Sequence, residues 1–479
     1  MRTDNEKLIK LLESTDQANV LIAFQICQNF SYNREVGKML QKYPLLCIEH
    51  LLERDYLTEL DLSNTQCAKL PDNITHFKKL QKLNLSYNGL KELPEEIGKL
   101  KDLKELKLDN NQLTGLPESI GQLSQLEKLN LGYNTLVSLP IAVGHLAKLQ
   151  QLDLACNGLK TLSRGILRLY DLETLDVSSN QLQVLPDVLS GLKNLQRLRA
   201  QHNHLRGLPD NIGNLSSLQE LRLSGNLIVN LPQSITKLQN LQTFELNQSL
   251  SRMNSRGFLS LPQNLGDLIH LKVLELSGNQ LEVLPESIRA MKNLQKLNLG
   301  GNRLKTLPES LGELMQLQEF SLKDNRTACF PEMLSKIPTL TKLDLGGNLY
   351  ETLPPSIGEF KSLKDLNLWG NNLRSLPAEI GALTALESLD LECNFLNTLP
   401  DEMGELQSLQ HLCLIDNQMS TLPKSMTKLT KLVKLRLSEN PLKNLTAIRA
   451  MYPHSYTEIE FKEQRGLIGR IRNIIRRSV

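Results

Sequence analysis

Leucine and asparagine recur along most of this chain at a fixed interval of 23 residues. The asparagines form two series with that spacing: Asn88, Asn111, Asn134, Asn157, Asn180, Asn203 and Asn226, then Asn279, Asn302, Asn325, Asn348, Asn371, Asn394, Asn417 and Asn440. Repeats of this length are typical of stacked units, which are stable only against their neighbours because one unit cannot bury its own apolar face. The length of the chain therefore reports a number of repeats, not a number of globular domains.

The repeat unit reads LxxLxLxxNxLxxLPxxIGxLxx, and seventeen copies fit between residues 57 and 454. Apolar and polar positions alternate in its LxLxx part, which predicts a short strand, and stacked copies predict a parallel sheet. The leucines fill the space between copies, while the asparagine amide can satisfy buried backbone groups as both donor and acceptor. We therefore predict an α/β solenoid, a horseshoe with a parallel β-sheet on its concave face.

Proline occupies one position of the unit in fifteen copies, and only Ser163 and Thr446 replace it. An acidic residue often follows the proline, as Glu95 follows Pro94. Proline is accepted at the first position of a helix, and an acidic side chain there complements the helix dipole. The pattern thus predicts one short helical turn per copy on the convex face.

The two ends of the chain depart from the repeat. In residues 1–56, apolar side chains such as Leu8 and Leu12 follow helical spacing, which predicts a helical cap over the first repeat. Residues 455–479 contain YTEIEF, which alternates like an edge strand, and an arginine-rich segment with an apolar side. We interpret this end as a cap, and the alternative is weak contact with an anionic membrane surface.

The 23-residue unit with its LPxxIG segment resembles the repeats of intracellular Ras-scaffold, scribble-type and plant intracellular Ras-group leucine-rich-repeat proteins, over about 390 of the 479 residues. The resemblance implies a leucine-rich-repeat horseshoe that binds proteins, with small GTPases and phosphatases among the partners known in that group. It transfers no binding residue, because the shared motif consists of buried framework positions.

The formal net charge is only +3 for 479 residues, so no overall field attracts the chain to nucleic acid or to a membrane. The seven cysteines are an odd number without close pairs, which favours free thiols in a reducing compartment. The N-terminus lacks the apolar core of a signal peptide, and no stretch approaches the ~18 apolar residues that span a bilayer. We expect a cytoplasmic protein.

The sequence carries no pattern typical of an active site. There is no GxxxxGK[ST] and no strand-linked GxGxxG. The carboxylates of Asp153 and Asp176 fall on an exposed sheet, where they would lack the burial that tunes a catalytic pKa. His202 and His204 form an HxH pair without a third ligand in register. We predict no enzyme activity, no cofactor and no metal.

Three departures from the Ser, Gly, Asn and Asp that fill most outward strand positions are candidate binding features. The first is an apolar patch in copies fourteen to sixteen, and its residues are Trp369, Cys393, Cys413 and Ile415, with Asp344, Asp390 and Glu392 at the rim. Exposed aromatic anchors are enriched at interface hot spots. We predict a partner site around Trp369, the only tryptophan; the alternative is a self-packed surface residue.

The second departure is a basic strip in copies seven and eight, formed by Arg199, Arg222, Gln201 and His202 beside Glu245 and Glu275. Cross-strand ion pairs and partner contacts explain this strip equally well. The third is copy nine, where Ser249 replaces the asparagine and extra residues lie within 246–258, including Arg252. This segment is either a binding loop or a tolerated insertion.

Together these features predict a monomeric, non-catalytic interaction scaffold or adaptor that binds a protein on its concave face, and the resemblance implies a role in signalling. Two alternatives are compatible with the same sequence features. One is an exported recognition or adhesion protein of the same fold. The other is an enzyme inhibitor that wraps its target.

Overall fold

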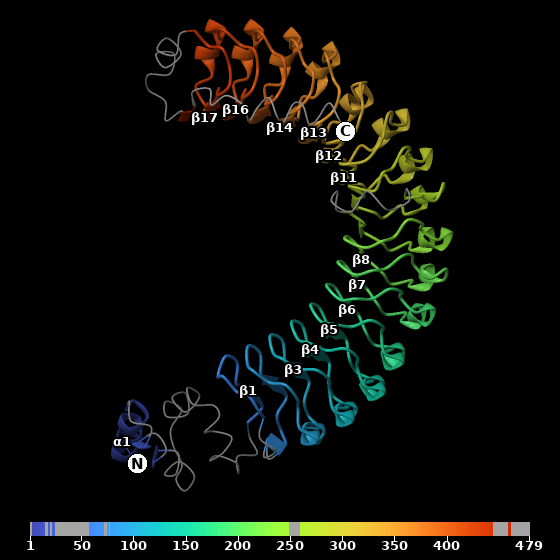
Figure 1. The fold of residues 1–479 in the computed structure, drawn as a ribbon, viewed down its shortest axis with the longest axis vertical. Helices are drawn as coiled ribbons and strands as arrows, with labels where there is room; N and C mark the ends of the chain where they lie inside the picture. Colours follow the sequence, from blue (N-terminus) through green and yellow to red (C-terminus); the bar gives the residue numbers. More distant parts are fainter. Residues whose placement is uncertain are drawn as a thin grey trace. The chain divides into compact units, whose positions relative to one another are not determined.

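The computed structural model describes residues 2–14, 18–19, 22–23, 57–70, 74–75, 77–248, 259–443 and 458–460. The chain divides into two compact units, Met1–Ile228 and Val229–Val479. Figure 1 labels strands of both units and colours the ribbon along the sequence. Each unit is a stack of repeats whose strands pair in parallel.

The sheet of the first unit contains eight three-residue strands that pair in parallel in the order of the sequence. They are β1 (Glu59–Asp61), β2 (Lys82–Asn84), β3 (Glu105–Lys107), β4 (Lys128–Asn130), β5 (Gln151–Asp153), β6 (Thr174–Asp176), β7 (Arg197–Arg199) and β8 (Glu220–Arg222). The central leucine of each strand faces its counterpart in the next, so the 23-residue period of the sequence becomes the register of the sheet.

The sheet of the second unit is built in the same way from ten strands in sequence order. They are β9 (Thr243–Glu245), β10 (Val273–Glu275), β11 (Lys296–Asn298), β12 (Glu319–Ser321), β13 (Lys342–Asp344), β14 (Asp365–Asn367), β15 (Ser388–Asp390), β16 (His411–Cys413), β17 (Lys434–Arg436) and β18 (Glu458–Glu460). The last strand, β18, falls inside the predicted edge strand of the C-terminal cap and pairs with β17.

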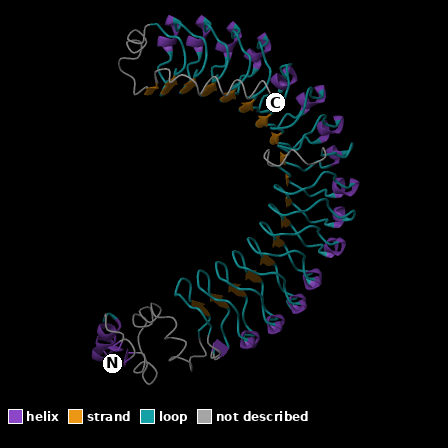
Figure 2. Ribbon diagram, viewed as in Figure 1, coloured by secondary structure: helices purple, strands orange, loops and turns teal. Residues whose placement is uncertain are grey.

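A short helix follows the proline of most repeats, on the side of the stack opposite the strands (Figure 2). In the first unit these helices are η2 (Glu95–Lys99), η3 (Glu118–Gln122), η4 (Ile141–His145), η5 (Arg164–Arg168), η6 (Asp187–Gly191) and η7 (Ile212–Asn214). In the second unit they are η8 (Gln233–Lys237), η10 (Leu265–Asp267), η11 (Glu286–Ala290), η12 (Glu309–Glu313), η13 (Glu332–Lys336), η14 (Pro355–Glu359), η15 (Ala378–Ala382), η16 (Asp401–Glu405) and η17 (Lys424–Lys428).

These turns are 3-10 helices, and the proline sits one position earlier than the sequence suggested. Pro94 precedes η2 in an extended conformation, and its carbonyl accepts the first helical hydrogen bond from the Ile97 N–H at 3.1 Å. Proline suits this place because it donates no N–H of its own. Where Ser163 replaces proline before η5, its hydroxyl oxygen accepts from the Gly165 N–H at 3.2 Å.

The recurrent asparagines satisfy buried backbone groups, as predicted, and they also form a ladder that links adjacent repeats. The Nδ2 group of Asn371 donates to the Leu345 carbonyl in the preceding repeat at 3.1 Å and to the Leu368 carbonyl in its own repeat at 3.0 Å. Its Oδ1 atom accepts from the Tyr350 N–H at 3.2 Å. The amide thus satisfies backbone groups of two buried turns, while leucines fill the space between the strands and the helices.

The N-terminal segment begins with the α-helix α1 (Arg2–Leu12), in which Leu8 and Leu12 are buried, as the helical spacing predicted. Most of the predicted 1–56 cap, the inserted segment with Arg252, and the basic C-terminal residues 461–479 lie outside the described residues. None of the helices in the described part of the chain has the length and apolar character that crossing a membrane requires.

Candidate functional site

The sheet face of the second unit is lined by strand side chains and by the turn that follows each strand. In β13, β14 and β15 the third residue of the strand accepts a hydrogen bond from this turn: the Trp369 N–H donates to Asn367 Oδ1 at 2.9 Å, and the Glu392 N–H donates to Asp390 Oδ1 at 2.9 Å. The Gly346 N–H donates to Asp344 Oδ1 at 3.2 Å in the same way. These polar residues therefore have a structural role that the sequence analysis did not assign.

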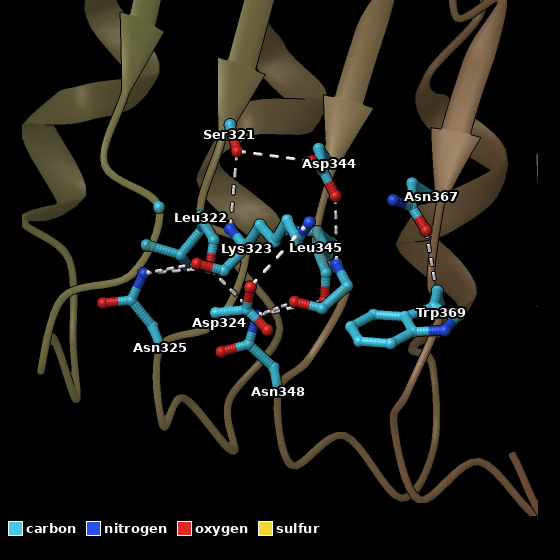
Figure 3. A network of polar contacts seen from close by, with 12 residues as sticks. Ser321, Leu322, Lys323, Asp324, Asn325, Asp344, Leu345, Asn348, Asn367 and Trp369 are labelled. Carbon is cyan, nitrogen blue, oxygen red and sulfur yellow. Dashed lines mark hydrogen bonds and ion pairs between the residues drawn. The ribbon is translucent and has the colours of Figure 1, made fainter. Parts of the chain in front are cut away.

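Trp369 lies on this sheet face and is half-buried rather than fully solvent-facing. Lys323, Gly346 and Trp369 occupy equivalent positions in three successive repeats. Because Gly346 has no side chain, Lys323 extends across that repeat, and its Nζ atom lies 5.7 Å from the centre of the indole ring (Figure 3). The structure thus places a cation on the tryptophan, an arrangement that the sequence reading missed.

Two half-buried carboxyl groups flank the tryptophan. Burial raises the pKa of Asp344, although the Gly346 N–H and the charge of Lys323 act in the opposite direction. Burial also raises the pKa of Asp390, against the hydrogen bond from the Glu392 N–H. In both cases the protein holds a carboxylate where its charge is partly desolvated.

The predicted apolar patch around Trp369 is more polar and more enclosed than expected. Cys413 has 8% relative exposure, and burial raises the pKa of its thiol to about 12. Its sulfur lies 3.6 Å from Glu392 Oε2 and 3.8 Å from Arg436 Nη1. Cys393 and Ile415 are half-buried. The patch is therefore a mixed surface in which sulfur atoms contact charged groups.

Ligand atoms of Asp390, Glu392 and Cys413 lie within 4.8 Å of one another, a grouping that could hold a metal ion. The thiolate is the metal-binding form of cysteine, and the raised pKa keeps this thiol protonated. The guanidinium of Arg436 also lies beside the same sulfur. We interpret the cluster as an ion-paired part of the sheet face.

In the first unit, the basic strip is organised around Glu220, which the sequence analysis did not single out. Arg199 Nε donates to Glu220 Oε1 at 2.9 Å, and Arg222 forms an ion pair with the same carboxylate. Arg199 also lies 4.0 Å from Asp176. The sequence analysis set these arginines beside Glu245 and Glu275, but Glu275 pairs with Lys296 at 3.0 Å. For Arg199, cross-strand pairing is thus observed, whereas Arg222 pairs with a carboxylate of its own strand.

Glu220 was missed because it is the first residue of its strand, further from the repeat asparagine than the strand residues that the sequence analysis selected. Burial acts to raise the pKa of Glu220, but the hydrogen bond and charge of Arg199, with Arg222, hold it below its usual value. Of the other two predicted members of the strip, Gln201 is half-buried and His202 is exposed in a left-handed turn with φ of 53°.

The same turn position carries two exposed tyrosines that sequence reasoning did not select. Tyr87 and Tyr133 have relative exposures of 61% and 60% and φ angles of 56° and 54°. Glycine, which adopts positive φ without strain, occupies this position at Gly225 and in four repeats of the second unit. The signal available in the sequence was a large residue directly before the repeat asparagine.

The expectation that Asp153 and Asp176 lie on a solvated face was wrong, because both side chains are half-buried. The Oδ1 atom of Asp153 accepts from the Ala155 N–H at 2.9 Å. Burial and the neighbouring charges of Asp176 and Asp109 raise its pKa. The group serves the turn after β5, as Asp390 does after β15.

A family model described as a leucine-rich repeat region matches residues 15–156, 140–226, 250–348 and 332–437. The chain belongs to the leucine-rich repeat family. The first match begins inside the segment 1–56 that the sequence analysis predicted to be a cap. No curated protein matches the sequence significantly.

Solved structures of leucine-rich repeat proteins are similar to this one over most of its length. A protein of Leptospira interrogans shares 32% identity with a TM-score of 0.60, over 87% of this chain and 97% of its own. The plant peptide hormone receptor RGFR1, in complex with RGF2, shares 27% identity with a TM-score of 0.61, over 82% of this chain and 73% of its own. The Arabidopsis receptor kinase HAESA, in complex with an IDA peptide hormone, shares 27% identity with a TM-score of 0.60, over 78% of this chain and 64% of its own.

Proposed function

We propose that this leucine-rich repeat protein is a non-catalytic binding protein that holds a protein partner on the sheet face of its second unit. The contact area, called here the Trp369 surface, comprises Lys323, Asp324, Asp344, Trp369, Asp390, Glu392 and Ile415. The observation that carries the proposal is the position of Trp369. The only tryptophan of the chain lies on a sheet face whose equivalent positions are mostly small or polar, and it fills no part of the leucine core.

Tryptophan is among the residues most enriched at interface hot spots, where a large, half-buried ring gives contact area at low entropic cost. The two plant receptor structures with 27% identity each hold a peptide hormone. They support a partner that presents a peptide segment to this protein, without indicating which one. The resemblance of the repeat unit to Ras-scaffold and scribble-type proteins makes small GTPases and phosphatases the first partners to test.

We propose further that the protein acts as a monomeric adaptor in the cytoplasm. Among the described residues, all five cysteines carry free thiols: Cys67, Cys156, Cys329, Cys393 and Cys413. Free thiols are typical of reducing compartments. The half-buried carboxyl groups Asp153, Asp344 and Asp390 each accept a hydrogen bond from a turn N–H, which supports a structural rather than a catalytic use.

The proposal is tested by capturing partners with the full-length chain and measuring the Kd of each with the wild type and with Trp369→Ala. Loss of a hot-spot side chain should weaken binding by about 30-fold or more. Tyr170→Ala is the matched control, because Tyr170 is an exposed aromatic residue that follows η5, away from the sheet face. Equal affinities of Trp369→Ala and the wild type for every captured partner would contradict the proposal.

A further inference from the structure

The contact between Lys323 and Trp369 shows what kind of group the indole face accepts. The Lys323 ammonium lies over the ring at 5.7 Å from its centre and 3.8 Å from Asp324 Oδ2. Ammonium and guanidinium groups are attracted to the face of an indole ring, which carries negative charge density. The lysine side chain is nearly half exposed, so its ammonium can leave the ring without breaking the core.

The carboxylates around the ring are more numerous than the turns require. Asp344 on β13 and Asp390 on β15 each accept the N–H two residues further along. Asn367, on the strand between them, accepts the equivalent bond from Trp369 with a neutral amide. The turn therefore needs an oxygen at this position but not a negative charge, so the turn does not explain the charges at Asp344 and Asp390.

The net charge of the Trp369 surface is negative. Its carboxylates belong to Asp324, Asp344, Asp390 and Glu392, and its cation is Lys323, with Arg436 at the edge 4.0 Å from Glu392. Four negative and two positive charges leave a formal excess of two negative charges. Such a surface repels nucleic acid and anionic lipid and attracts basic groups.

We propose that the Trp369 surface binds a basic segment of the partner protein, with an arginine or lysine on the indole face where Lys323 lies in the free protein. This inference rests on the proposed function and names the chemistry of the partner. Asp344 and Asp390 lie two strands apart, about 10 Å. One cationic side chain reaches one of them, so a segment with at least two cationic residues engages both.

The test uses a synthetic peptide of four arginines alternating with glycine, and a peptide with glutamate in place of arginine. Binding is followed by the fluorescence of Trp369, which reports this surface alone because the chain has no other tryptophan. We expect the arginine peptide to change the emission with an affinity that falls as salt concentration rises, and the glutamate peptide to leave it unchanged. No response to the arginine peptide, or equal responses to both, would overturn the inference.

Two variants test the roles of Asp344, Asp390 and Lys323. The double variant Asp344→Asn/Asp390→Asn keeps the turn hydrogen bonds. It should weaken binding of the arginine peptide at least 5-fold and make the affinity less dependent on salt concentration. Lys323→Ala should strengthen binding several-fold, because the competing ammonium is gone. Asp153→Asn is the matched control, since it makes the same change at the equivalent position of the first unit and should leave the Kd unchanged. Weaker binding to Lys323→Ala, or an unaltered Kd in the double variant, would contradict the inference.

A captured partner separates this inference from the proposed function. If Trp369→Ala abolishes binding and Asp344→Asn/Asp390→Asn leaves it intact, the surface binds a partner but not through basic groups, and only the inference fails. If neither variant changes binding, both fail. If Trp369→Ala and the double variant both lose binding, and the melting temperature of the double variant is unchanged or higher, the proposed function and the inference are both supported.

Discussion

The side-chain hydroxyls of Thr327 and Tyr350 lie 2.7 Å apart inside the second unit, at positions that most repeats give to leucine. Both residues are buried, and burial raises the pKa of Tyr350 to about 12. Thr327 Oγ1 also donates to Asn348 Oδ1 at 2.8 Å, so the tyrosine hydroxyl is the donor to the threonine. A polar chain thus connects the asparagine ladder to the core.

Replacing Thr327 with valine should destabilise the second unit by about 1–3 kcal/mol, because the buried Tyr350 hydroxyl loses its acceptor. Adding Tyr350→Phe should recover part of this loss, since the double variant leaves no buried hydroxyl there. The measurement is the urea midpoint of Trp369 fluorescence, which reports unfolding near these repeats. Strictly additive losses in the double variant would show that the two hydroxyls do not depend on each other.

The asparagine ladder makes a prediction about charge. In Asn371→Asp, a carboxylate oxygen replaces the Nδ2 group that donates to the carbonyls of Leu345 and Leu368. The variant should lose about 3 kcal/mol or more, because oxygen atoms would face each other in a buried site. Asn372→Asp, the adjacent half-buried position, is the control and should change stability by less than about 0.5 kcal/mol. Similar midpoints for the two variants would rule out this account of the ladder.

The raised pKa of Asp153 predicts a pH dependence. Because folding raises this pKa above its unfolded value, the folded chain binds the proton more tightly, and the carboxylate reduces stability at neutral pH. This loss of stability is present above the pKa of the folded state. It disappears as the pH falls from that pKa to the pKa of the unfolded state. Asp153→Asn keeps the oxygen that accepts the Ala155 N–H. It should therefore stabilise the first unit at pH 7, by less than about 1 kcal/mol because solvent screens the half-exposed group, and have no effect near pH 3.

The reverse change at the neighbouring strand is the control for this prediction. Asn130 occupies the equivalent position on β4, where its Oδ1 atom accepts the Gly132 N–H and its Nδ2 group donates to Asp109. Asn130→Asp should lower the melting temperature at pH 7, because it adds a carboxylate beside Asp109. A stabilising Asn130→Asp or a destabilising Asp153→Asn at pH 7 would refute the electrostatic explanation.

The repeat architecture could be predicted because its determinants are local and recur every 23 residues. Asn371 and its counterparts make the same bonds in repeat after repeat, so a sequence period is enough to indicate them. The place of Pro94 relative to the helix was harder to predict, because proline is accepted both as the first residue of a helix and as the residue before it. Only the backbone angles of the 3-10 turn distinguish the two.

The site was less predictable because it depends on side-chain conformations between repeats. Trp369 stands out in the sequence, but the approach of Lys323 depends on the missing side chain of Gly346 and on a lysine rotamer. Arg199 likewise lies nearer to Glu220 than to Asp176, and this depends on the conformation of the arginine side chain. Such choices follow from packing across three strands, and no period in the sequence encodes them.

The cluster around Glu220 leads to the last prediction. The carboxylate of Glu220 contacts Arg199 and Arg222, and its pKa in the folded chain lies below the usual value. The carboxylate therefore stabilises the fold at any pH above the pKa of the unfolded state. This contribution is lost as the pH falls through the lower pKa of the folded state. Glu220→Gln should cost about 1 kcal/mol at pH 7 and less at pH 3. Hydrogen exchange of the amides in β7 and β8 measures this locally, since the first unit has no tryptophan. Glu92→Gln changes an exposed glutamate and is the control; if both variants exchange like the wild type at pH 7, the arginines are not stabilised by Glu220.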